Sequence, residues 1–356
     1  MPSRDEILAV LAAIQDPDLR RDVVSLGMIK DLAINDTGRV SFTFELTTPA
    51  CPVRDRFHEL ASKLVADIPG VTAVDVKMTA KVQSPFNGRS HEAAIPGVKH
   101  VIAVGSGKGG VGKSTVAVNL ASSLQLSGAR VGLLDADIYG PSVPGMLGVS
   151  DQPQVREQRL VPLEAFGMKV ISIGLLAGAD KAMVWRGPLV GRAIEQMLRD
   201  VWWGELDYLV VDLPPGTGDA SLTLAQAVPL TGIAVVCTPQ ETALRIALKA
   251  LQMFRGLNVP ALGLIENMSS FICDCGREHF IFDHGRAERS AQRLGVPYLG
   301  AIPLEESIRE EADAGAPIVV TRPDSAGALA LRKIASALAA RVSVQSFRSL
   351  PVINVR

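Results

Sequence analysis

The stretch that most constrains this chain is VIAVGSGKGGVGKST, residues 101–115, in which an apolar run leads into a glycine-rich loop. The apolar run predicts a strand, and the amphipathic pattern after the loop predicts a helix. The loop satisfies G-x-x-x-x-G-K-[ST] with Gly107, Gly112, Lys113 and Ser114. A strand, such a loop and a helix in this order predict a binding site for the phosphates of a nucleotide.

Each residue type in the loop has its own role. Glycines let backbone N–H groups converge on phosphate oxygens, because no Cβ stands in the way. Lys113 is expected to neutralise the β and γ phosphates of ATP, and the Ser114 hydroxyl to ligate Mg²⁺. The alternative, a glycine-rich turn with a solvated lysine, is rare in this context. The expected nucleotide contacts are Gly107, Lys108, Gly109, Gly110, Val111, Gly112, Lys113, Ser114 and Thr115.

A second lysine, Lys108, stands inside the loop where the general motif demands no particular residue. GKGGVGKS resembles the deviant P-loop of the MinD, ParA, ArsA and nitrogenase iron-protein group. In that group the additional lysine reaches across a dimer interface to the partner's nucleotide. The resemblance therefore implies a nucleotide-gated homodimer, with Lys108 and Lys113 taking part in ATP hydrolysis.

Composition is that of an ordinary globular protein. The chain has 356 residues, 47% of them hydrophobic, and a formal net charge of −1. Length predicts two domains, and the near-neutral charge gives no reason to expect nucleic acid or an anionic membrane as a partner. The N-terminal residues lack the pattern of a secretory signal, so we expect a cytoplasmic protein. The uncharged window 221–240 is broken by proline and glycine and is too polar to span lipid.

Residues 1–83 are predicted to form a small α+β domain. Ser3 and Glu6 have capping-box spacing for a first helix, and residues 31–46 alternate around a turn as in a β-hairpin. The order of elements resembles the SufT/PaaD-like domains associated with iron-sulfur assembly, which make the positions of Asp16 and Cys51 prominent. We expect Cys51, just before a helix, to have a lowered thiol pKa, unless it is an unreactive, half-buried loop cysteine. Residues 84–97 are predicted to be a linker.

From residue 98 to about 342, apolar strand-like runs alternate with helical patterns. Continuous apolar runs indicate strands that are covered on both faces. We therefore predict an α/β fold, a mainly parallel sheet with helices on both faces, as in P-loop NTPases. Residues 343–356 are expected to form a C-terminal tail. In such a sheet, ligands bind at the carboxyl ends of the strands.

Three aspartates follow two of these runs, Asp135 and Asp137 after ARVGLL and Asp212 after YLVV. Resemblance to the deviant P-loop group makes the first pair switch I, in which Asp137 positions or activates the attacking water. Asp135 is expected to support the water shell of the metal, although either residue could be only a turn or helix cap. Asp212 is the expected Walker B ligand of Mg²⁺. The residues expected to form switch II are Gly216, Thr217, Gly218 and Asp219.

Asn267 and Pro303 also follow predicted strands. In the deviant P-loop group, an asparagine and a proline-bearing loop at these places hold the adenine ring. By this resemblance, Asn267 binds the base edge through its amide, and Pro303 lies beside it.

Cys273 and Cys275 lie in a loop beyond a predicted strand. In a cytoplasmic chain with four cysteines, two so close together are better explained by metal than by a structural disulfide. Two thiolates cannot complete a tetrahedral site, but a symmetric dimer would supply four. A solvent-exposed turn with unreactive thiols is the alternative.

With these residues the chain, from 98 to about 340, resembles the Mrp/ApbC family of ATPases that carry iron-sulfur clusters. The resemblance implies an ATP-hydrolysing homodimer that holds a bridging cluster, expected to be 4Fe-4S, and exchanges it with scaffold proteins and apoproteins. One departure is that the family usually has C-x-x-C where this chain has C-D-C. Two alternatives stay open, a MinD- or ParA-like positioning ATPase without a cluster, and an electron-transfer component like the nitrogenase iron protein.

Overall fold

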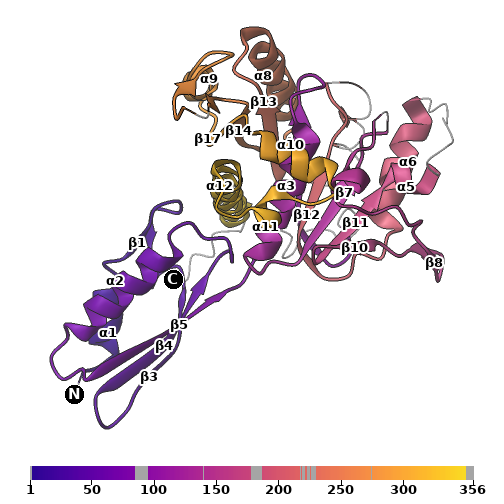
Figure 1. Ribbon diagram of the computed structural model, residues 1–356. Coiled ribbons are helices and arrows are strands. Elements are labelled where there is room, and N and C mark those ends of the chain that lie inside the picture. The colour runs from indigo at the N-terminus through magenta and orange to yellow at the C-terminus, as the bar shows by residue number, and fades with distance from the viewer. Residues whose placement is uncertain are drawn as a thin grey trace.

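A large sheet and a small N-terminal sheet divide the chain between them (Figure 1). The structure, a computed structural model, describes residues 2–84, 95–138, 140–177, 187–216, 218, 221, 222, 225, 230–273 and 275–349. Thr217 and Asp219 of the predicted switch II and most of the predicted linker lie outside these residues. The division into domains at residues 83 and 97 stays a prediction.

The small sheet has the order β3-β4-β5, and helices α1 and α2 pack beside it (Figure 1). β3 and β4 are antiparallel, which confirms the predicted hairpin, and β5 runs parallel to β4. The Ser3 hydroxyl accepts from the Glu6 N–H and the Glu6 side chain accepts from the Ser3 N–H, so the capping box is confirmed. The elements are α1 (Arg4–Leu11), β1 (Gln15–Asp16), β2 (Arg21–Asp22), β3 (Ile29–Ile34), β4 (Arg39–Leu46), α2 (Arg54–Ala66) and β5 (Ala73–Ala80).

The large sheet has the order β10-β11-β7-β12-β6-β13-β14-β17. All neighbouring strands are parallel except β10, which runs antiparallel to β11 at one edge. The predicted mainly parallel sheet is confirmed. Its strands are β6 (Val98–Ser106), β7 (Val131–Asp135), β10 (Leu163–Ala165), β11 (Met168–Ser172), β12 (Leu206–Asp212), β13 (Gly232–Cys237), β14 (Ala261–Asn267) and β17 (Tyr298–Ile302).

Helices cover both faces of this sheet. On the central strand β6, Ile102 and Val104 belong to the core with α3 and α12, whereas Val101 and Ala103 belong to the core with α6, α8 and α9. This alternation explains why the strand is apolar throughout. The helices on the two faces are α3 (Lys113–Leu126), α4 (Val143–Met146), α6 (Gly187–Arg199), α8 (Glu241–Gly256), α9 (Arg286–Leu294), α11 (Ile318–Thr321) and α12 (Ala326–Ser349).

Helix α12 runs across the predicted boundary at residue 342 and ends at Ser349. None of the described helices combines the length and the apolar composition that crossing a bilayer requires. The remaining elements are α5 (Ile173–Ala177), α10 (Glu306–Asp313) and the two short hairpins β8 (Val155–Arg156) with β9 (Arg159–Leu160) and β15 (Phe271–Ile272) with β16 (Glu278–His279).

Direct contacts join the small sheet region to the large one. The Tyr208 hydroxyl donates to Thr48 Oγ1 at 3.0 Å, and His100 Nε2 lies 2.8 Å from the Gln83 carbonyl oxygen. Ala50 and Val82 are buried in the same apolar cluster as α3 and α12. The N-terminal region is therefore packed against the strands that carry the nucleotide loop.

Candidate functional site

The predicted phosphate loop lies between β6 and α3. Gly112 is the N-cap of α3, and both Gly110 and Gly112 have positive φ angles, of 77° and 79°. Glycine adopts this left-handed conformation without the steric cost that a Cβ would add. At Gly107 an added Cβ would come within 2.5 Å of the Ala247 nitrogen on α8, so the loop is pressed against that helix.

Lys113 lies at the centre of a buried group of charges. Its Nζ donates to Asp212 Oδ1 at 2.7 Å and lies 3.5 Å from Asp137 Oδ2. Ser114 Oγ donates to Asp212 Oδ2 at 2.5 Å. The structure thus brings together Lys113, Ser114, Asp137 and Asp212, residues that are far apart in the sequence, with the Asp212 side chain fully buried.

Asp135 forms the base of this group. Its carboxylate accepts hydrogen bonds from the Asp137 N–H at 3.1 Å and from the Ser172 hydroxyl at 3.0 Å. Burial, together with the neighbouring Asp212 charge, raises the pKa of Asp135 to about 7. Burial also raises the pKa of Asp212, and the Lys113 ammonium opposes that shift. Hydroxyl and carboxylate oxygens are suitable ligands for Mg²⁺, so Ser114 and Asp212, which lie in contact, fit this ion.

Lys108 is half-buried in the loop, and its Nζ donates to Gln240 Oε1 at 3.2 Å. Gln240 is a contact that sequence reasoning missed, as is Ser172. Both residues follow apolar runs at the carboxyl ends of strands, the same signal that identified Asp135 and Asp212. Whether Lys108 reaches a partner's nucleotide stays a prediction.

The two predicted adenine-binding residues lie near one another and near the loop. Asn267 is buried, and its Nδ2 donates to the Val111 carbonyl at 2.9 Å. The Leu304 N–H bonds the Ser270 carbonyl at 2.7 Å, which holds the segments after Asn267 and around Pro303 side by side. Pro303 is half-buried at the end of β17.

Cys273 and Cys275 lie in the exposed β15–β16 hairpin and are joined there by a disulfide. This differs from the predicted metal-binding dithiol. The physical reason is the short spacing, because with one residue between them the two Cα atoms lie 5.3 Å apart, within the reach of a disulfide. Among the described residues, no group of three or more His, Cys, Asp or Glu side chains is arranged to hold a metal ion.

The prediction of a lowered thiol pKa at Cys51 is wrong. The residue precedes α2, as expected, but burial, with smaller contributions from the charges of Asp16 and Asp18, raises its pKa to about 11. One backbone hydrogen bond, at Val53, opposes these effects but does not outweigh them. Cys237 is buried at the end of β13.

Comparison with known proteins identifies the family of the larger region. The model of the NUBPL iron-transfer P-loop NTPase family matches residues 97–339, which is more than half of the chain. The chain belongs to this family. A second family model, for an iron-sulfur cluster assembly protein, matches residues 4–76. The resemblances stated for the two regions of the sequence are thereby confirmed.

Relatives of this iron-transfer NTPase extend over nearly its full length. An iron-sulfur cluster carrier protein of Deinococcus radiodurans is 48% identical and covers 98% of each chain, and one of Escherichia coli is 43% identical and covers 95% of this chain and 92% of its own. A nucleotide-binding protein of Archaeoglobus fulgidus, solved in complex with ADP, is 39% identical, with a TM-score of 0.56 over 61% of this chain and 87% of that chain. The expected P-loop NTPase fold is confirmed.

Proposed function

We propose that this protein is a cytoplasmic, ATP-hydrolysing homodimer that holds an iron-sulfur cluster between its subunits and exchanges it with scaffold proteins and apoproteins. The observation that carries this proposal is the presence, in one chain of this family, of a buried charge group at the nucleotide loop and a pair of cysteines in an exposed hairpin.

The proposed binding and hydrolysis of ATP rest on the buried charge group at the loop. Lys113 now pairs with Asp212, and phosphate oxygens would compete for the same ammonium group. Ser114 and Asp212 would hold Mg²⁺, which supplies charge neutralisation for the phosphates. Asp137, held by its N–H on the Asp135 carboxylate, is placed to orient the attacking water.

The proposed dimer rests on two features that a second subunit would complete, Lys108 and the pair of cysteines. In this chain Lys108 is held by Gln240, a neutral and replaceable partner, so a partner's phosphate could draw it away at small cost. The two sulfurs of one chain make half of a four-thiolate site, and a two-fold axis would supply the other half. ATP binding would favour the dimer with Lys108 extended, and hydrolysis would reverse this preference.

Reduction is a required step, because thiolate is the ligand and a disulfide cannot bind iron. The test is therefore anaerobic reduction followed by reconstitution with iron and sulfide, measuring visible absorbance, iron per chain and mass in solution. We expect one cluster per dimer in the native protein and none in Cys273→Ser/Cys275→Ser. Cys51→Ser, which removes a thiol outside the hairpin, is the matched control and should load normally.

Two outcomes would overturn the proposal. If the reduced native protein takes up no cluster, the remaining function is that of a nucleotide-switched ATPase. If Cys51→Ser fails to load while the hairpin variant loads, the cluster is held elsewhere. A separate test asks whether cluster transfer is coupled to ATP. If Lys113→Ala transfers its cluster at the native rate, cluster transfer does not depend on ATP.

A further inference from the structure

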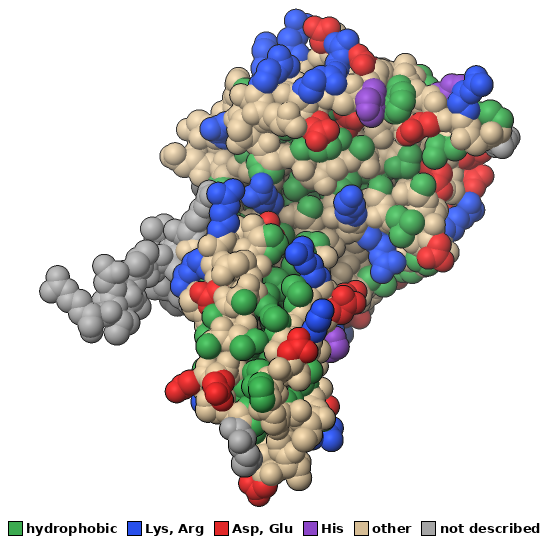
Figure 2. All heavy atoms as spheres, turned by 90° about the vertical axis from the view of Figure 1, so that its left-hand side faces the viewer, with side chains coloured by type: hydrophobic (Ala, Val, Ile, Leu, Met, Phe, Trp, Pro, Cys, Tyr) green, Lys and Arg blue, Asp and Glu red, His purple; other side chains and the backbone are tan. Residues whose placement is uncertain are grey.

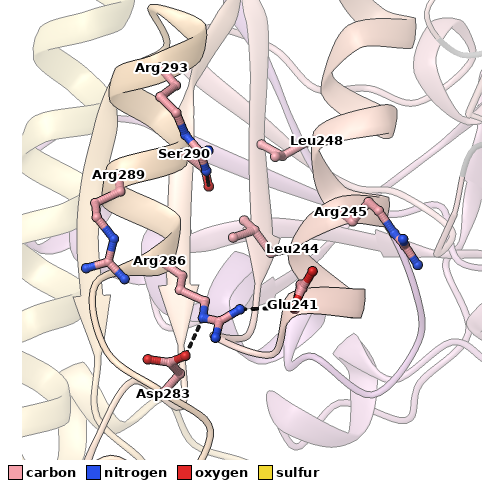
Figure 3. A pocket seen from close by; sticks show the side chains of 9 residues that line it. All are labelled: Glu241, Leu244, Arg245, Leu248, Asp283, Arg286, Arg289, Ser290 and Arg293. Carbon is pink, nitrogen blue, oxygen red and sulfur yellow. Dashed lines mark hydrogen bonds and ion pairs between the residues drawn. The ribbon is translucent and has the colours of Figure 1, made fainter.

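A groove between helices α8 and α9 is not used by the proposed nucleotide and cluster sites (Figure 3). It has a cavity volume of about 560 Å³. Leu244 and Leu248 of α8 form the apolar part of its lining, and four arginines and two carboxylates form the charged part. Figure 3 shows the arginines Arg245, Arg286, Arg289 and Arg293 around this space.

The groove has an excess of unneutralised positive charge. Arg286 pairs with Asp283 and with Glu241, so its charge and those of the two carboxylates are largely engaged with one another. In the described part of the chain, the three other guanidiniums form no ion pair, and Arg289 and Arg293 donate only to a backbone carbonyl and to a serine hydroxyl. Guanidinium groups without an ion-pair partner are suited to binding carboxylates.

The shape and lining of the groove favour one kind of ligand. An open groove with leucines beside arginines matches an extended peptide that carries both acidic and apolar side chains. The whole chain has a net charge of −1, so no wider positive field around the groove favours the long run of phosphates in a nucleic acid. Figure 2 shows Lys and Arg side chains gathered at the upper end of the molecule, at the height of α8 and α9.

The two helices that form the groove are joined in the chain to the nucleotide loop's contact Gln240 and to the cysteine hairpin. Helix α8 begins directly after Gln240, the partner of Lys108, and α9 follows the cysteine hairpin. The ring of Phe280 lies 4.3 Å from that of His284, whose carbonyl accepts from Arg289. A peptide held in the groove would therefore lie next to the segment that follows the cysteine hairpin.

From these observations we infer that the α8–α9 groove docks an acidic peptide segment of the protein that receives the cluster. The role of recipient rests on the proposed carrier function, whereas peptide binding does not. The arginines would contact carboxylates, and the half-buried Leu248 would contact an apolar side chain between them. Because the groove is open to solvent, binding should weaken as salt is raised.

The test measures binding of cluster-free, full-length protein to a fluorescein-labelled peptide of glutamates interrupted by leucines. The comparison peptide has glutamine in place of every glutamate. We expect the acidic peptide to bind at low salt and Arg289→Glu/Arg293→Glu to weaken it by about tenfold or more. Arg332→Glu/Lys333→Glu, a matched charge reversal at exposed positions of α12, should bind like the native protein.

Several results would overturn the inference. These are equal binding of the acidic and glutamine peptides, unchanged binding by Arg289→Glu/Arg293→Glu, or tighter binding of a single-stranded oligonucleotide than of the acidic peptide. Both variants change exposed side chains, so both should fold, and circular dichroism checks this. If the native protein binds the peptide but loads no cluster, the carrier function fails while the docking surface stands.

Discussion

The nucleotide loop and the cysteine hairpin differ in almost every physical respect. Lys113, at the start of α3, and Asp212, at the carboxyl end of β12, are buried, and several hydrogen bonds fix their positions. The hairpin has two strands of two residues each, and the apolar side chains of Ile272 in the hairpin and of Ile281 just after it are 53% and 56% exposed. The buried charge group is formed entirely by residues of one chain, whereas the hairpin exposes apolar side chains to solvent.

This contrast explains how one fold can combine a fixed chemical site with an adaptable one. A preorganised charge group stabilises phosphates without rearrangement at the moment of reaction. An exposed hairpin can accept different partners, because few contacts within the chain have to be broken. We therefore expect substitutions in the loop to have large effects within a single chain, and substitutions in the hairpin to act mainly on assemblies.

The largest effect should come from Lys113→Ala. Removing the ammonium group takes away the charge that faces Asp212 and Asp137 and the expected contact to the phosphates. We expect ATP hydrolysis to fall by about 100-fold or more, as measured by phosphate release. Ser127→Ala, at the other end of α3, where the hydroxyl donates only to the Ser123 carbonyl, is the control. Hydrolysis at the native rate in Lys113→Ala would mean that the buried charge group is only structural.

The next effect concerns the backbone of the loop. Gly112→Ala places a Cβ against the Asn267 side-chain amide at a φ of 79°. We expect the free energy of unfolding to fall by about 2–3 kcal/mol, from backbone strain and the lost hydrogen bond to Val111. Urea unfolding measures this.

The matched control for Gly112→Ala is Gly109→Ala, in the same loop, where an added Cβ meets no atom within 4 Å. It should change the free energy of unfolding by less than about 1 kcal/mol. Equal effects of the two substitutions would contradict the close packing of Asn267 against the loop.

A pH effect should appear on the strand that carries the loop. Burial lowers the pKa of His100 to about 4, whereas an unfolded histidine titrates near 6.5. The unfolded chain therefore binds a proton that the folded chain does not, and stability is lost as pH falls from about 6.5 toward 4. We expect a loss of about 2 kcal/mol between pH 7.5 and 5, absent in His100→Asn. Urea midpoints that shift equally in both proteins would assign the loss to other groups.

Features of the fold and the site that depend on neighbouring residues could be predicted from the sequence, whereas those that depend on residues far apart in the chain could not. The loop, its strand and its helix were predicted because residue type alone determines such local geometry. The Lys108–Gln240 contact was not, since it joins residues far apart in the sequence through the packing of α8 on the loop. The pKa of Cys51 was predicted in the wrong direction, because its position before a helix is local but its burial is tertiary.

The N-terminal region adds a third kind of surface to this comparison. Figure 2 shows hydrophobic side chains gathered in a band on the lower part of the molecule, where the small sheet region lies in Figure 1. Beneath the surface, Phe44 and Phe57 stack with ring centroids 5.3 Å apart in a closed core. This region therefore has its own core, as the large sheet does, while also exposing apolar area, as the hairpin does.

The smallest effect should come from Ile281→Ser in the segment after β16. Because Ile281 is 56% exposed, we expect the free energy of unfolding of the cluster-free protein to change by less than about 0.5 kcal/mol. Leu133→Ala, at a fully buried position of β7, should cost about 2–5 kcal/mol in the same urea experiment. A loss above about 1 kcal/mol for Ile281→Ser would show that the hairpin packs against the core of its own chain. Its apolar side chains would then no longer be available to a second subunit or a recipient, and the contrast between the two regions would fail.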